Sequence, residues 1–372
     1  MGGNSIKLKA VGDIMLGDHP VCYGHGVRSV IERKGFDFLT EGLESVLEEK
    51  DLLFCNLESV LSDFESDPKS LPKMELRGRP DEAECLAKLG FDILNVANNH
   101  ALQHGVTAFD ETVSLVADKG MHPIGLSGSS GDSKVFEWEK DGVKIDFISY
   151  SMRPEKFSKG EIPYARGEKD DIISFVRDRR SQTDAVIVLS LHWGDEYMNY
   201  PSAEQISMAR ELVDVGVNLI LGHHPHVLQG VEKYRGGVIV YSLGNFVFDK
   251  WQRNPRETAV FSCEIGIDGV IEYELIPILI AKSFQPMSVK GKDAEKIQSK
   301  LSDYSRALKL IVAGEGKYAA YSGDSYKAMS ERAYLKFRIQ SYLYFFTRIY
   351  KYSFSMISFS FFRFVLRRFG KD

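Results

Sequence analysis

Apolar runs alternate with amphipathic stretches through the first 280 residues of the chain. Runs such as IKLKAVGD, LLFCNLES and FDILNVANNH have the length and composition of buried strands. The stretches DEAECLAKLG and VTAFDETVSLVADKG, which lie between runs, repeat apolar residues at helical spacing and end at a glycine. A strand–helix series of this kind predicts an α/β domain with a mostly parallel central sheet and helices outside it.

Two later segments, VIVYSLGNFVFD and AVFSCEIGIDGVIEYELIPILI, are longer and predict hairpins, with a turn at Asp268–Gly269 in the second. The stretch that follows is polar with a helical pattern. We therefore expect a domain at residues 1–283, a helical connector at residues 284–330 and a tail at residues 331–372.

The length of 372 residues is enough for one large α/β domain with an appendage, or for two domains. The net charge of −5 argues against general nucleic-acid binding. Four dispersed cysteines without a CxxC pair indicate reduced thiols rather than a disulfide framework. The opening MGGNSIKLKAVGDIML predicts a strand rather than a signal peptide, and no apolar run reaches the roughly 18 residues of a membrane span. These features favour a cytoplasmic protein.

Polar residues that can bind metal ions stand at or just after the ends of the predicted strands. They are Asp13, Asn56, Glu58, Asn98, Asn99, His100, His192, His223, His224, His226 and Asn245. Open α/β sheets place their ligand crevice at the carboxyl ends of the strands. Imidazole and carboxylate donors together suit Zn, Mn or Fe. The pattern predicts a divalent metal site at this edge.

The stretch LGHHPHVLQG holds three of the nine histidines of the chain. Only a turn can aim both His224 and His226 at one point, because they are two residues apart. Pro225 would stiffen that turn, and Gly222 would free its backbone. A capping cluster could also explain the three histidines, and a lone His192 after a strand is more often structural. Five strand ends with ligand-type residues favour the metal site.

Six motifs occur here in the order that a known family shows. They are AVGDIMLGD, NLES, LGFDILNVANNHALQHG, LHWGDEY, GVNLILGHHPHVLQG and VIVYSLGNFVFD. Over residues 6–282 the chain resembles CapA-type bacterial capsule synthesis proteins, the poly-γ-glutamate group of the calcineurin-like metallophosphoesterase superfamily. The resemblance implies a four-layer α/β/β/α sandwich with a metal site at one rim, followed here by a C-terminal helical extension.

The resemblance also implies roles for single residues. The metal ligands would be Asp13, Glu58, Asn99, His192, His224 and His226. Glu58 stands where the superfamily usually has a bridging Asp, and His100 beside Asn99 would protonate the leaving group. Met15 replaces a usual histidine ligand, so one or two ions are expected. Supporting side chains would be Asn56, Asn98, His223, Asn245, His104 and Asp18.

Two functions follow from these features. The first is a metal-dependent hydrolase or transferase that acts on a polymer or on a phosphorylated or acyl small molecule. The second is a non-catalytic accessory component of a polymer synthesis or export complex, recruited to the membrane.

The tail differs in composition from the rest of the chain. Residues 331–372 hold nine Lys and Arg against two acidic residues, which leaves a net charge of −12 on residues 1–330. Apolar side chains recur at helical spacing at Leu335, Ile339, Tyr342, Phe346 and Ile349. The tail therefore predicts either an amphipathic segment on an anionic membrane surface, at the inner face of the membrane, or a helical hairpin packed on the domain.

Overall fold

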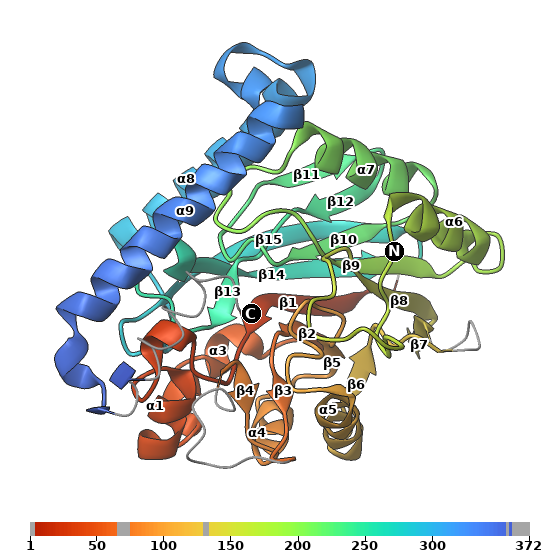
Figure 1. Cartoon of the computed structure of the whole chain (residues 1–372). Helices are drawn as coiled ribbons and strands as arrows, with labels where there is room; N and C mark the ends of the chain where they lie inside the picture. Colours follow the sequence, from red (N-terminus) through yellow and green to blue (C-terminus); the bar gives the residue numbers. More distant parts are fainter. Residues whose placement is uncertain (1–3, 65–74, 129–133, 355–356, 359–372) are drawn as a thin grey trace.

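The computed structural model describes residues 4–64, 75–128, 134–354 and 357–358. Two β-sheets pack face to face at its centre, and helices lie on their outer faces (Figure 1). This arrangement confirms the predicted four-layer α/β/β/α sandwich. The single central sheet that the strand–helix pattern alone favours is in fact two sheets, because the chain leaves the first sheet after residue 124 and builds a second.

The first sheet has the strand order β16–β15–β14–β1–β2–β5–β6, with β13 beside β1. Its strands are β1 (Ile6–Ile14), β2 (Leu52–Leu57), β5 (Ile93–Asn95), β6 (His122–Ile124), β13 (Asn245–Val247), β14 (Glu257–Gly266), β15 (Gly269–Ile280) and β16 (Pro286–Ser288). Strands β1, β2, β5 and β6 are parallel, whereas β14, β15 and β16 add antiparallel neighbours. The hairpin predicted for the second long segment is confirmed as β14 and β15.

The second sheet has the order β11–β12–β10–β9–β8–β7. Its strands are β7 (Val135–Lys140), β8 (Val143–Ser151), β9 (Val186–His192), β10 (Leu219–His223), β11 (Val231–Tyr234) and β12 (Gly237–Val240). A short separate pair is formed by β3 (Val60–Leu61) and β4 (Arg77–Gly78).

The segment VIVYSLGNFVFD is not the hairpin that its pattern predicts. Its first half is β12, which runs parallel to β10 in the second sheet, and its second half is β13, which runs parallel to β1 in the first. The intervening residues 241–244 carry the chain from one sheet to the other, so Asn245 arrives opposite Asp13. Local pattern cannot show this crossing, because both halves are apolar.

Both faces of the central strands are buried, which explains their continuous apolar runs. In β2, Leu53 and Cys55 face the helices, while Leu52 and Phe54 face the second sheet. Because successive residues of a strand point to opposite sides, one apolar run supplies two cores.

In the described part of the chain, eight α-helices precede the last one and cover or flank the sheets. They are α1 (Val27–Lys34), α2 (Asp37–Thr40), α3 (Glu44–Leu47), α4 (Glu82–Lys88), α5 (Val106–Asp118), α6 (Lys169–Arg180), α7 (Ala203–Asp214) and α8 (Gly291–Ala313). Apolar residues of α1 to α5 pack on the first sheet, and those of α6 and α7 pack on the second. Helix α8 contacts both, since Leu308 and Ile311 join the core of the second sheet while Ile297 and Leu301 pack with Ala259 of β14.

The last long helix is α9 (Gly323–Thr347). It begins before the predicted tail and includes residues 331–347 of it. Phe337 stacks on Tyr197 with 4.1 Å between ring centroids, and Tyr344 packs on Trp251 at 4.6 Å. One face of α9 therefore packs on the domain, as the hairpin alternative expects. The predicted continuation of the amphipathic pattern lies mostly outside the described residues. Among the described residues, no helix combines the length and the hydropathy that crossing a bilayer requires.

We predict that Phe337→Ala destabilises the whole domain by about 3 kcal/mol, because it removes a buried aromatic ring. The matched control is Phe346→Ala on the exposed face of the same helix, which should change stability by less than about 0.5 kcal/mol. Denaturant unfolding, followed by circular dichroism and fluorescence, measures both. Equal stability of the two variants would contradict the packing of α9 on the domain.

Candidate metal centre

Polar residues lie side by side at the ends of adjacent strands in both sheets. In the first sheet Asp13 of β1 is in register with Asn56 of β2, and Asn56 with Asn95 of β5. In the second sheet His192 of β9 is in register with His223 of β10. The two rows meet: Asn56 Nδ2 lies 3.4 Å from His192 Nδ1, and His223 Nδ1 lies 3.2 Å from Asp13 Oδ1. The crevice predicted from the strand ends is thus a meeting point of two sheets.

The turn after β10 has an unusual backbone. His224 and His226 have φ values of +96° and +57°, in the left-handed region that favours glycine. Such a conformation stores strain, which persists only where the surroundings impose it. Position 222 requires glycine for a different reason, because a Cβ there would overlap the carbonyl oxygen of Tyr241. The turn aims both histidines toward the buried carboxylates.

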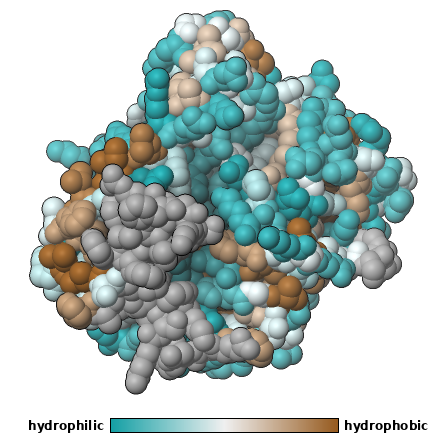
Figure 2. Space-filling view, in the orientation of Figure 1, coloured by the Kyte–Doolittle hydropathy of each residue, from teal (hydrophilic) through white to brown (hydrophobic). Residues whose placement is uncertain are grey.

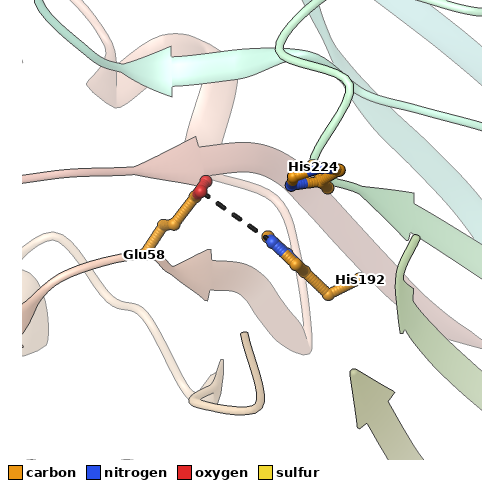
Figure 3. A group of neighbouring side chains, drawn as sticks. All are labelled: Glu58, His192 and His224. Atoms are coloured by element: carbon orange, nitrogen blue, oxygen red, sulfur yellow. Dashed lines mark ion pairs between the residues drawn. The ribbon is translucent and has the colours of Figure 1, made fainter. Parts of the chain in front are cut away.

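Two groups of side chains could each hold a metal ion. The first is Glu58, His192 and His224, and the second is Asp13, Glu58 and His226. Within each group the candidate ligand atoms all lie within 4.8 Å of one another, and every residue is buried. Figure 3 shows the side chains of the first group pointing toward one another. Glu58 belongs to both groups.

Glu58 is the centre of the cluster. Its Oε1 lies 3.7 Å from His226 Nε2 and 3.8 Å from His192 Nε2, too far for hydrogen bonds. Within the described residues, neither oxygen of Glu58 and neither ring nitrogen of His224 has a hydrogen-bond partner. Buried polar atoms without partners are costly, and a divalent cation would bind a carboxylate oxygen of Glu58 and one ring nitrogen of His224. The donor set fits a metal ion.

Asp13 is held by hydrogen bonds from three sides. Asn56 Nδ2 donates to its Oδ1 at 2.8 Å, and the backbone N–H of His224 donates to its Oδ2 at 3.3 Å. His223 Nδ1 completes the set from the second sheet. Asn56 is itself held by Asn95, whose Nδ2 donates to Asn56 Oδ1 at 2.8 Å. These bonds fix where the carboxylate points.

The remaining imidazoles are also oriented by amides. His226 Nδ1 donates to Asn245 Oδ1 at 2.9 Å, which turns its Nε2 toward Glu58. His192 Nε2, the ring nitrogen that faces Glu58, lies 2.6 Å from Asn99 Oδ1, so the Asn99 oxygen reaches the first group. The structure therefore brings together all six residues that the family resemblance implies as ligands.

Burial and charge move the pKa values of this cluster in opposite directions. Burial, followed by the charge of Asp13, raises the pKa of Glu58 well above its usual value. Burial would also raise the pKa of Asp13, but bonds and charges from His223 and His226 hold it well below the usual value. Burial lowers the pKa values of His192 and His224, so both imidazoles are neutral at neutral pH. Neutral imidazole is the form that binds metal.

His100 lies where the cluster reaches the surface. Its Nε2 is 3.7 Å from Glu58 Oε1, and its side chain is 20% exposed while that of Glu58 is fully buried. Nδ1 donates to Gln103 Oε1 at 2.7 Å, and the backbone N–H donates to Asn98 Oδ1 at 3.1 Å. Asn98 is anchored in turn to the carbonyl of Leu57. Burial lowers the pKa of His100 to about 4.

Asp18, His104 and Met15, which the sequence also singled out, have their main contacts away from the two groups. Asp18 accepts hydrogen bonds from Ser29 and orders the loop before α1. His104 donates to the carbonyl of Glu75 at 2.7 Å. Met15 packs in a small apolar cluster with Leu76 and Phe248.

Sequence reasoning missed several residues of the site. Asn95 links the network, and its position at the end of β5 could have indicated it. Lys250 is buried, and its Nζ donates to the hydroxyl of Tyr197 at 3.1 Å. Arg153 lies close enough for its charge to help lower the pKa of His224, after burial and His192. Lys250, Tyr197 and Arg153 come from loops that local pattern does not place.

Comparison with known proteins gives a match to one family model, described as "Bacterial capsule synthesis protein PGA_cap", over residues 7–250. The chain is 31% identical over 299 residues to "PGA biosynthesis protein CapA" of Bacillus subtilis, covering 78% of this chain and 75% of that protein. It is 27% identical over 309 residues to "Capsule biosynthesis protein CapA" of Bacillus anthracis, covering 80% and 73%. Among solved structures, the sulfate thiohydrolase SoxB of Thermus thermophilus aligns with a TM-score of 0.43 and 14% identity, covering 80% of this chain and 60% of that chain.

We predict that Glu58→Gln removes bound divalent metal, because the substitution takes away the charge that both groups share. His122→Ala, an exposed histidine on β6, is the matched control and should retain metal like the wild type. Elemental analysis after reconstitution with Mn, Fe or Zn measures the content. Equal metal in E58Q and wild type would show that the cluster is not the binding site.

We also predict that metal affinity falls as the pH is lowered. The raised pKa of Glu58 means that, below it, a metal ion must displace a proton from this carboxyl group. For each proton displaced, the apparent affinity should fall about tenfold per pH unit below that pKa and level off above it. Calorimetric titration with Mn²⁺ over a pH series measures the slope, and a flat profile would contradict the assignment.

Proposed function

The chain belongs to the family of bacterial capsule synthesis proteins described by the PGA_cap model, and we propose that it uses two divalent ions for hydrolysis or group transfer in polymer synthesis. One ion would lie among Glu58, His192 and His224, and the other among Asp13, Glu58 and His226. The observation that carries this proposal is Glu58, a buried carboxylate shared by both groups and without a hydrogen-bond partner among the described residues.

The donor types support Mn, Fe or Zn as the metal. Neutral imidazoles and carboxylates are the usual ligands of these ions. In the first group Asn99 adds an amide oxygen, since its Oδ1 lies 2.6 Å from His192 Nε2. The second group has three donors because Met15 is directed into an apolar cluster. Different ligand numbers would give the two positions different affinities.

In the proposed reaction, the metal and the side chains of the protein have different roles. A bound divalent ion supplies Lewis acidity and lowers the pKa of water from about 15.7 toward 7. His100 holds or moves a proton at Nε2, while Gln103 fixes its ring through Nδ1. Burial is the main cause of its low pKa, and an anionic substrate nearby would raise that pKa by attraction of the charged form. His100 is therefore our candidate general acid.

Positive side chains near the cluster suit an anionic substrate, such as a phosphorylated or acyl-phosphate compound or an acidic polymer. Arg153 is close to His224, and its side chain is 29% exposed. Lys250 lies near the opposite group, since it packs over the ring of Phe248, which in turn contacts His226 at 4.8 Å. A substrate anion could bind between these cations.

A second candidate function is a non-catalytic role in a capsule synthesis complex. Met15 favours it, because the Asp13 group has one donor fewer than the usual superfamily site. In that case the cluster would hold metal for structure, and the polymer or a partner protein would be bound rather than cleaved.

The two functions predict different kinetics. With metal-loaded protein and p-nitrophenyl phosphate, bis(p-nitrophenyl) phosphate and acetyl phosphate as probes, His100→Asn should keep its metal and lose about 10²- to 10⁴-fold in kcat. E58Q should lose both metal and turnover, and His122→Ala should keep both. Turnover that E58Q retains would contradict catalysis at this site. Absence of turnover in the metal-loaded wild type, with every probe, would favour the accessory role.

A further inference from the structure

Helix α9 has apolar side chains on two opposite faces. The inner face is buried, and its residues are Phe337, Ser341 and Tyr344. The outer face is between 52% and 65% exposed, and its residues are Leu335, Ile339, Leu343 and Phe346. At about 100° per residue, these four positions form one stripe opposite the inner face. A helix that is apolar all round is normally covered on both sides.

The inner contacts prevent the outer stripe from turning inward. Phe337 stacks on Tyr197 and, at 5.4 Å, on Trp251. Beyond the helix, Tyr352 packs on His25 at 4.9 Å and donates a hydrogen bond to the carbonyl of Val21. The stripe is thus a fixed part of the surface. Figure 2 shows apolar atoms gathered at the left of the view, where α9 runs in Figure 1.

Cationic residues border this stripe. Lys336 and Arg338 are exposed and lie on its two sides, and Arg348 and Lys351 follow at the end of the helix. The sequence from 332 to 351 contains no acidic residue. Within the described chain, no ion pair involves Lys336, Arg338 or Lys351. The outer face of α9 is therefore bordered by positive charge, whereas the first 330 residues of the chain carry a net charge of −12.

From this geometry we propose that the outer face of α9 docks on an anionic lipid surface. Interfacial helices have this design: apolar and aromatic side chains enter the acyl boundary, and Lys and Arg reach the headgroups. Anionic lipid attracts such cations, whereas a second copy of the same face would oppose like charges. The positive charges beside the stripe therefore favour docking on anionic lipid over self-association through this face.

Docking would also place the candidate metal centre close to the lipid. Tyr197, which supports Phe337, lies 6.2 Å from His226 between ring centroids. Helix α9 itself would then separate the cluster from the lipid, since its inner face contacts Tyr197 and its outer face would contact the membrane.

The test is co-sedimentation of the full chain with phosphatidylcholine vesicles, with and without phosphatidylglycerol. The wild type should bind the anionic vesicles and bind the neutral ones at least tenfold more weakly. Leu335→Glu/Phe346→Glu should lose at least tenfold in partitioning. The matched control is Ile267→Glu/Ile271→Glu, at positions 65% and 58% exposed on the β14–β15 hairpin, and it should bind like the wild type. Lys336→Gln/Arg338→Gln should weaken binding and reduce its dependence on salt.

Three results would overturn the proposal. They are equal binding to neutral and anionic vesicles, wild-type binding by L335E/F346E, and a wild-type dimer that this variant abolishes without any vesicle binding. The third result would assign the stripe to a second copy of the chain. Vesicle binding by E58Q should equal that of the wild type, so a failure of docking and a failure of the metal assignment are separate outcomes.

Discussion

The structure depends on two carboxylates, Asp13 and Glu58, that are buried where the ends of two sheets meet. An ionised carboxylate in a protein interior costs several kcal/mol unless a partner compensates it. Among the described residues, only histidines lie within ion-pair distance of these two groups. Hydrogen bonds satisfy Asp13, whereas neither oxygen of Glu58 has a hydrogen-bond partner among the described residues. A divalent cation would satisfy it, and the left-handed backbone at His224 and His226 aims both rings toward the place where that cation would bind.

Much of this site could be predicted from the sequence, because the polar residues follow apolar strands and strand ends share an edge. The pairing of strands could not be predicted that way. The crossing between β12 and β13 puts Asn245 beside Asp13, although the local pattern of that segment is typical of a hairpin. Asn95 belongs to the hydrogen-bond network of the site because β5 is in register with β2, and this register depends on residues far apart in the chain. Asp18 and His104 lie near the ligands in sequence, but their loops direct them to backbone partners.

The tail shows why pattern alone left two alternatives open. Apolar residues lie on both faces of α9, so helical spacing predicts an amphipathic surface whichever face is considered. In the structure the inner face packs on Tyr197 and Trp251, and the outer face stays exposed between cations. The two alternatives are therefore compatible, since one helix can pack on the domain and present a second surface. The same helix links that surface to the wall of the candidate metal centre.

The most direct test of the central claim is anomalous diffraction from crystals of the chain grown with Mn²⁺. The account predicts two anomalous peaks on either side of Glu58. One would lie among Glu58, His192 and His224, and the other among Asp13, Glu58 and His226. No peak at either position, with Glu58 hydrogen-bonded to protein or water instead, would contradict the account.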